Sequence, residues 1–269
     1  MKRLLLALFF LLPISSSAQF NGCSAGFCAP PSSGGGGGGG VLSLDGTARN
    51  GQATAALTVA NGTAFSNATN ASIIGAAISY EYTSGTPAAV SGVSGGGLTW
   101  APIATSTDVA GSTRTELWWA YAATKLTSQT ITATVANTNG NFDDATIVVF
   151  AVTGFLGTAY QTAPWDVNAS LPKTNFGVNS APTETGISTT SANSMVINVV
   201  GSNDNAAITA PTGLSVGTNM SIVNTGGTNN SSTYVATEVL SSTLSSVTQT
   251  WTGNQVQWAG IVHALKAGP

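Results

Sequence analysis

Few side chains in this sequence are suited to catalysis. Charged residues make up only 6% of the 269 positions, whereas a typical soluble domain has roughly a quarter. The one histidine, His263, alternates with Ile261 and Leu265, and alternating positions of a strand share a face. We therefore expect His263 to lie in or beside the core. A catalytic histidine also needs an orienting partner, and the sequence identifies none.

Two Gly-x-Ser-x-Gly strings, Gly92–Gly96 and Gly213–Gly217, resemble the setting of a nucleophilic serine. Such a nucleophile elbow lies between a strand and a helix, and neither string is followed by a helical pattern. The residue inventory allows a Ser-His-Asp triad, but both strings are expected by chance in a chain so rich in Gly and Ser. We therefore predict no catalytic residues and no enzymatic activity.

One turn is rich in oxygen ligands. Asp143 and Asp144 follow Asn139 and Asn141, and Ca²⁺ binds carboxylate and amide oxygens. No EF-hand spacing is present, and such turns usually bond their own backbone, so Ca²⁺ is a candidate and no other cofactor is expected. Neighbouring Asp143 and Asp144 would point apart on a strand, which is poor geometry for the acid/base pair of a glycosidase.

The aromatic residues favour binding over catalysis. Trp118 and Trp119 are adjacent, so on a strand they face opposite ways. We assign Trp118 to the outer face, beside Glu116 and Arg114, where an exposed indole would stack on a sugar ring. The alternative is that the second half of the chain covers it. Trp251, between two threonines, poses the same question.

The charge balance argues against polyanionic partners. The chain holds seven Lys and Arg against ten Asp and Glu, and two of the basic residues are Lys2 and Arg3. Binding to nucleic acid needs many cations that displace condensed counterions, and binding to anionic lipid needs basic clusters. We expect neither partner.

The N-terminus has the pattern of a secretory signal peptide. A short basic region, 1–3, precedes the apolar stretch Leu4–Leu12, which is too short to span a bilayer. Pro13 ends this stretch, and small residues lead to a predicted cleavage after Ala18. We therefore predict residues 1–18 to be removed and the protein to be secreted or on the cell surface, with no transmembrane segment.

Residues 19–40 form a cysteine-bearing tail and a glycine linker. Cys23 and Cys28 are the two cysteines of the chain, and in an oxidising compartment they could close a small disulfide loop. Lipidation of Cys23 and pairing between chains are the alternatives. The seven glycines at 34–40 predict a flexible spacer of about 15 Å.

The rest of the chain has the features of an internal duplication. Short segments recur in the same order, at offsets of 121, 122, 116, 118 and 114 residues. The matched segments are Leu44–Ala48 with Trp165–Ala169, Ser72–Ile78 with Ser194–Val200, Gly97–Trp100 with Gly213–Val216, Leu126–Thr132 with Leu244–Thr250, and Ile147–Val149 with Ile261–His263. Five matches in one order indicate two copies of one unit.

Short alternating segments separated by turn residues predict an all-β fold. Ser72–Tyr82 is nearly all apolar or small, which indicates a strand covered on both faces. Ala145–Val152 is apolar on both faces and should be central. Thr113–Tyr121 alternates in the manner of a strand with two distinct faces.

We predict two tandem or closely packed β-sandwich repeats, of the Ig-like or jelly-roll type, at residues 41–155 and 156–269. They could also merge into one larger sandwich. The junction is expected at Leu156–Thr185, and its Trp165 and Phe176 favour burial between two copies in close contact.

The signal peptide, the 21–28 tail, the polyglycine and the Trp165–Pro172 motif together resemble secreted or phage-associated β-sandwich proteins of bacteria, fibre-like or adhesin-like. The resemblance implies adhesion or display and supplies no catalytic residues. We therefore expect a non-enzymatic exported protein that binds a glycan or a protein surface. The alternatives are a carbohydrate-active enzyme or its accessory binding domain, and a structural protein of a virion or tail fibre.

Overall fold

The computed structural model describes residues 41–52, 58–82, 88–108, 112–136, 142–155, 158–203, 208–212, 218–223, 231–253 and 255–266. The predicted signal peptide, the Cys23–Cys28 pair and the glycine linker lie outside these residues. The described part of the chain is all-β, as predicted, with antiparallel sheets and a single 3₁₀ turn, η1 (Thr158–Gln161).

The first eight strands form two sheets. A five-stranded sheet has the order β1-β8-β3-β6-β5, and a three-stranded sheet has the order β2-β7-β4. The strands are β1 (Ser43–Gln52), β2 (Thr58–Ala60), β3 (Ser72–Tyr82), β4 (Val90–Ser94), β5 (Ala101–Thr107), β6 (Thr113–Ala122), β7 (Thr132–Val135) and β8 (Phe142–Thr153).

The last eight strands repeat this strand order. Their sheets are β13-β14-β11-β16-β9 and β10-β15-β12, which result from adding eight to each strand number of the first half. The strands are β9 (Lys173–Ser180), β10 (Thr183–Ile187), β11 (Met195–Asn203), β12 (Thr209–Thr212), β13 (Thr218–Val223), β14 (Ser231–Val239), β15 (Val247–Thr252) and β16 (Gln255–Leu265).

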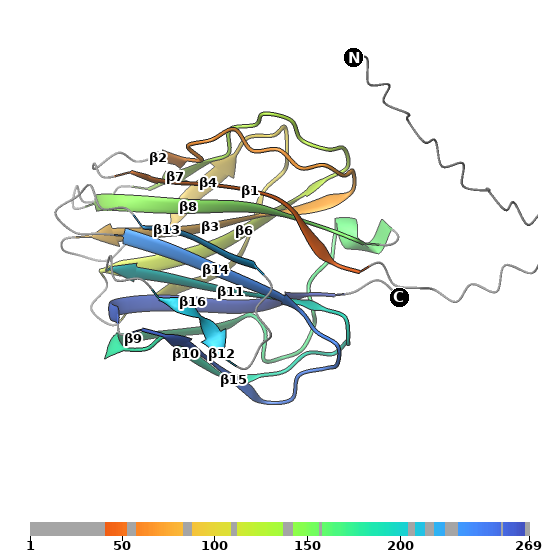
Figure 1. Ribbon diagram of the computed structural model, residues 1–269. Helices are drawn as coiled ribbons and strands as arrows, with labels where there is room; N and C mark the ends of the chain where they lie inside the picture. The colour runs from red at the N-terminus through yellow and green to blue at the C-terminus, as the bar shows by residue number, and fades with distance from the viewer. Residues whose placement is uncertain are drawn as a thin grey trace, which may run out of the picture. The chain divides into compact units, whose positions relative to one another are not determined.

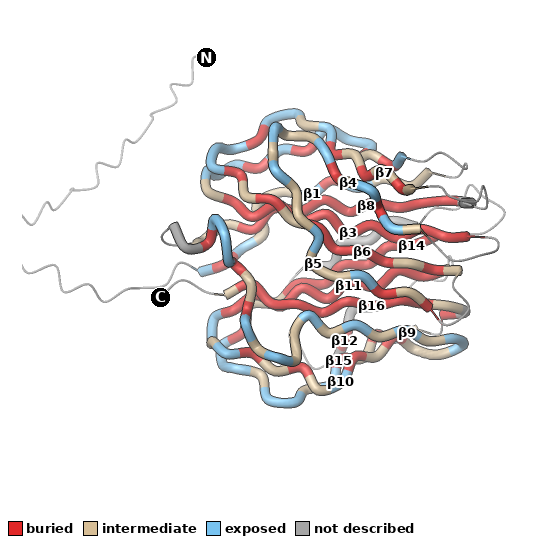
Figure 2. The backbone as a smooth tube through the Cα atoms, turned by 180° about the vertical axis from the view of Figure 1, so that it is seen from behind, coloured by how far each residue is buried: buried red, intermediate tan, exposed pale blue. Residues whose placement is uncertain are grey.

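The four sheets stack as layers, with the two five-stranded sheets in the middle (Figure 1). One core lies between the two sheets of the first half, a central core joins the two five-stranded sheets, and further cores lie within the second half. Every residue of β3 is buried, which confirms the prediction of a strand covered on both faces (Figure 2). β8 lies between β1 and β3, and its stretch Ala145–Val152 is buried, as predicted.

The central core is apolar at one end and rich in hydroxyl groups at the other. Ile73, Met195 and Leu265 belong to its apolar part. At the other end the Thr146 and Thr233 hydroxyl oxygens lie 2.6 Å apart across the interface. A buried hydroxyl must find a hydrogen-bond partner, so these pairs fix how the two sheets register against each other.

Matched hydrogen bonds accompany the repeated strand order. Asp45 Oδ2 accepts bonds from the backbone N–H and hydroxyl of Thr69, 24 residues later. Asp166 Oδ2 accepts the same two bonds from Thr190, also 24 residues later. These aspartates stand at the predicted offset of 121 residues.

One of the predicted matches is wrong by one residue. Ile73 pairs with Val152 on β8, and Met195 pairs with Leu265 on β16. Because Ile73 and Met195 correspond, Val152 corresponds to Leu265, and the offset here is 113 residues rather than 114. A slip of one residue exchanges the two faces of a strand, so Val148, not Ile147, corresponds to Ile261.

The junction between the halves is only partly buried. Trp165 is half-buried and packs against the central core. Phe176, however, is 44% exposed, so the expectation that it is buried is wrong. The reason is that β9 is the edge strand of its sheet, where a side chain has a neighbouring strand on one side only.

Candidate functional site

The two tryptophans that the sequence offers as ligand contacts are buried. Trp118 is 9% exposed and Trp251 1%. Trp118 does share its face of β6 with Glu116 and Arg114, but the sheet β2-β7-β4 covers that face. The prediction of an outward Trp118 is therefore wrong, because alternation shows that two residues share a face but does not show what covers it.

Glu116 is the centre of a buried hydrogen-bond cluster. Its Oε1 accepts bonds from the Tyr80 hydroxyl (2.9 Å), the Val90 N–H (2.9 Å) and Arg114 Nε (2.8 Å). Its Oε2 accepts a bond from Trp118 Nε1 at 2.9 Å. Burial and the nearby Glu116 charge raise the pKa of Tyr80. This arrangement joins three strands and presents no group to a ligand.

Trp251 belongs to a similar cluster in the second half. Its Nε1 donates to Asn198 Oδ1 at 3.2 Å, and Asn198 Nδ2 donates to Gln249 Oε1 at 2.7 Å. Glu184 is paired across the strands with Gln249 and is fully buried. Burial raises the pKa of Glu184 to about 8. A neutral carboxyl group at pH 7 fits this enclosed position.

The predicted Ca²⁺ turn is described only at Asp144. Asn139, Asn141 and the side chain of Asp143 lie outside the described residues. Asp144 is fully buried, and its Oδ2 accepts a bond from the Ser231 N–H at 2.8 Å, across the central interface. Among the described residues, no three Asp, Glu, His or Cys side chains are grouped as metal ligands would be.

His263 lies beside the central core, as predicted, and is 5% exposed. Burial lowers its pKa to about 4, although the Asp166 charge acts in the opposite direction. Its ring stacks on Trp165, with centroids 4.7 Å apart. Of the two Gly-x-Ser-x-Gly strings, the first ends β4 and enters a turn rather than a helix, and the second lies outside the described residues.

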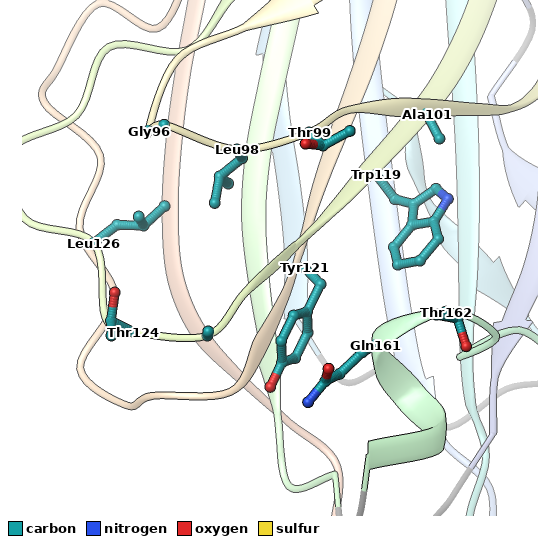
Figure 3. Close-up of a pocket in the computed structure, with 12 residues that line it drawn as sticks. Gly96, Leu98, Thr99, Ala101, Trp119, Tyr121, Thr124, Leu126, Gln161 and Thr162 are labelled. Carbon is teal, nitrogen blue, oxygen red and sulfur yellow. The ribbon is translucent and has the colours of Figure 1, made fainter.

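An open pocket lies between the end of β6 and the end of η1 (Figure 3). Its volume is about 560 Å³. The first half supplies the wall formed by β6 and the loop before β5, and the segment after η1 supplies the facing wall. The lining residues are Gly96, Gly97, Leu98, Thr99, Ala101, Trp119, Tyr121, Ala123, Thr124, Leu126, Gln161 and Thr162.

Trp119 and Tyr121 provide the aromatic surface of this pocket. They are two residues apart on β6, so they share a face, and both are partly exposed. Figure 3 shows their rings pointing towards the side of Gln161 and Thr162. The amide of Gln161 and the hydroxyl of Thr162 thus lie on the side of the pocket towards which the two rings point.

Two aromatic rings of the second half support Trp119 from behind. Trp165 meets Trp119 edge-on, with centroids 6.0 Å apart and an interplanar angle of 85°. Trp165 in turn stacks on His263. Edge-on and stacked aromatic pairs have defined geometry and add stability beyond buried area, so this series of rings holds the Trp119 indole in place.

The lining contains no charged side chain. Its polar groups are the hydroxyls of Thr99, Thr124, Thr162 and Tyr121 and the amide of Gln161. Such a wall suits a neutral ligand that has both C–H surfaces and hydroxyl groups. It contains no carboxylate or imidazole that could act as an acid or base.

The aromatic pair is specific to the first half. Leu117 on β6 pairs with Ala77, and Val235 on β14 pairs with Val199. Ala77 and Val199 occupy equivalent positions in the two halves, so Leu117 and Val235 are equivalent too. The positions that correspond to Trp119 and Tyr121 are therefore Thr237 and Val239. The sequence does contain a signal for this site, namely two aromatic residues at i and i+2 near a strand end, but alternation alone does not distinguish their face of the strand from the face of Trp118.

Among the described residues, no helix has the length and apolar character needed to cross a membrane. No protein-family model, no curated protein and no solved structure matches the chain.

Proposed function

We propose that the protein is an exported, non-enzymatic adhesion or display module that binds a neutral glycan in the pocket of Trp119 and Tyr121. The observation that carries this proposal is the pair of partly exposed rings on a wall of hydroxyl and amide groups without charge. Sugar rings present C–H faces that stack on aromatic rings, and their hydroxyls bond to amides and hydroxyls.

The pocket favours binding over hydrolysis. Glycosidases generally use two carboxylic side chains that flank the scissile bond, and the residues that line this pocket include neither Asp nor Glu. Export is supported by the signal-peptide pattern at 1–18, and display by the glycine spacer at 34–40.

We also infer that each half is a jelly-roll-type sandwich. The support is the pairing of β1 with β8, β3 with both β8 and β6, and β2 with β7, which places strands distant in sequence side by side. Lectin domains and viral capsid proteins both use jelly rolls, so the architecture alone does not select between binding and capsid roles.

A glycan-array screen of the secreted form with wild type and Trp119→Ala tests the proposal. Wild type should bind one class of neutral glycan, and Trp119→Ala should lose about fivefold or more in affinity, since stacking contributes about 1 kcal/mol or more per ring. Val239→Ala, at the position that corresponds to Tyr121 in the other half, serves as the control and should bind as wild type does.

Three results would contradict the proposal. A wild-type protein that binds no glycan leaves the pocket without the proposed ligand. Equal binding by Trp119→Ala places the ligand elsewhere. Release of shortened glycans during incubation shows an enzyme. Thermal melting of each variant establishes that it is folded before binding is compared.

A further inference from the structure

Phe176 is the one exposed aromatic ring among the described residues. It lies on β9, where Thr174, Phe176 and Val178 are exposed and the residues between them are half-buried. Gly177 fixes this alternation, because a Cβ there would lie 2.7 Å from Trp258 Nε1. The row therefore faces away from Trp258 and remains uncovered at the edge of its sheet.

Strand β5 connects this row to the pocket. At its start, Ala101 lines the pocket and pairs with Trp119. Near its end, the Ser106 hydroxyl donates to the carbonyl oxygen of Asn175 at 2.8 Å, next to Phe176. Ala101 and Ser106 are five residues apart, so the path between pocket and Phe176 is about 17 Å at the usual rise of a strand.

The surface along this path has the same character as the pocket. On the pocket's side of this path, Ile103 is partly exposed and Thr174 is exposed. Pro102 and Thr105 are exposed too, but they pair with Trp118 and Glu116 and therefore lie on the opposite face of β5. β5 contains no charged residue, and β9 contains only Lys173, at its first position. Both strands show exposed and intermediate stretches in Figure 2. Hydroxyl groups and apolar carbons thus continue from the pocket to Phe176.

We propose that the glycan is a linear neutral polysaccharide that occupies the Trp119 pocket with one part and extends along β5 to stack on Phe176. This inference rests on the proposed function and specifies its ligand. The second aromatic contact lies about 17 Å from the first, so only a polysaccharide long enough to span that distance can touch both. Two contacts on one chain act together, because binding at the first raises the effective concentration at the second.

Chain length is the variable that tests this inference. Dimers and hexamers of the cellulose, chitin and xylan series are titrated calorimetrically into wild type, Trp119→Ala and Phe176→Ala. Wild type should bind the hexamer of its preferred series at least tenfold tighter than the dimer. Phe176→Ala should lose that gain while its dimer affinity stays unchanged, whereas Trp119→Ala should weaken both.

Val167→Ala serves as the control, since Val167 is 76% exposed and lies on neither strand. It should keep the wild-type ratio of hexamer to dimer affinity. Phe176→Thr, which retains a β-branched residue suited to a strand, replaces Phe176→Ala if the alanine variant melts at a lower temperature than wild type.

Four results would overturn the inference. Equal affinities for dimer and hexamer, or an unchanged ratio in Phe176→Ala, restrict the ligand to the pocket and leave the proposed function intact. No binding in any series overturns this inference, and a blank glycan array then overturns the proposed function too. If Phe176→Ala instead converts a sedimenting dimer to a monomer, the β9 row is an interface with a second copy.

Discussion

At the scale of single residues, the buried carboxylates of Glu116 and Glu184 matter for the stability of the fold rather than for a chemical reaction. Glu116 and Glu184 are both fully enclosed within their halves, yet their surroundings differ. Glu116 accepts four hydrogen bonds, one of them from an arginine. Glu184 has amide neighbours and a raised pKa, so its neutral form is the stable one.

Replacement of Glu116 by Gln should destabilise the protein by about 3 kcal/mol. Glutamine has one acceptor oxygen where four donors converge, so the Trp118 indole N–H or the Arg114 guanidinium loses its partner. Urea denaturation followed by tryptophan fluorescence measures the change. A variant within 0.5 kcal/mol of wild type, a limit set by typical surface substitutions, would show that the cluster is not needed.

Glu184 should make stability fall as the pH rises. Its folded pKa of about 8 exceeds the unfolded value near 4.5, so the folded state holds a proton that the unfolded state has released. Stability is therefore lost progressively between these two values. His263, whose pKa is lowered to about 4, acts in the opposite direction and only below about pH 6.5.

Unfolding free energies at about pH 6.5 and pH 8.5 isolate the Glu184 effect, because His263 is neutral in both states over most of that interval. Wild type should lose stability across the interval, and Glu184→Gln should lose much less. Parallel pH profiles for the two proteins would rule out Glu184 as the cause.

At the scale of strands and sheets, close approach of the two central sheets depends on Gly201. A Cβ at this position would overlap the hydroxyl oxygens of Thr115 and Ser79 on the facing sheet. Gly201→Ala should therefore destabilise the protein by about 2–3 kcal/mol, as overpacking of a tight interior does. Chemical denaturation measures the loss.

Gly92→Ala is the matched control for this prediction. A Cβ at Gly92 would meet no atom within 4 Å, so stability should stay close to that of wild type. Similar losses of stability in both variants would show that replacing any strand glycine by alanine is destabilising. The close approach of the two sheets at Gly201 would then not be the cause.

Much of the strand pattern could be predicted from the sequence, because apolar periodicity reports burial directly. The all-apolar stretches became β3 and β8, and the alternating stretch Thr113–Tyr121 became β6. Which layer covers each face could not be predicted, because that depends on contacts between strands far apart in sequence. For this reason the sequence predicts Trp118 to be exposed and Phe176 to be buried, and the structure shows the reverse for both.

The aromatic character of the candidate site could be predicted from the sequence, but its position could not. Adjacent tryptophans on opposite faces indicated that one ring would be available to a ligand. The available ring is Trp119, and its partners Gln161 and Thr162 come from the segment that joins the halves. No local pattern connects residues some forty positions apart, so this wall of the pocket could only come from the fold.

At the scale of the whole body, the two halves share one central core and should unfold together. Ala77 and Phe150 of the first half and Ile197 and Ile261 of the second half are all buried in it. A fragment of residues 41–155 would expose its part of this core to water. We expect such a fragment to self-associate, since exposed apolar faces of this kind drive association.

Sedimentation velocity of the fragment, beside residues 41–269, tests this expectation. The longer protein should also show a single calorimetric transition. A monomeric, folded fragment, or two separate transitions in the longer protein, would show that the halves are independent domains.

The repeated strand order has a consequence for how such a site arises. A chain of half this length, paired with its own copy, has the strands needed to build the same four layers, but its two pockets would have to be identical. Joining the copies in one polypeptide removes that constraint. Position 119 then holds Trp while its counterpart 237 holds Thr. Fusion of the two copies into one chain therefore permits a single ligand site per molecule. A molecule with one site cannot crosslink two ligands, so crosslinking would require several molecules displayed together.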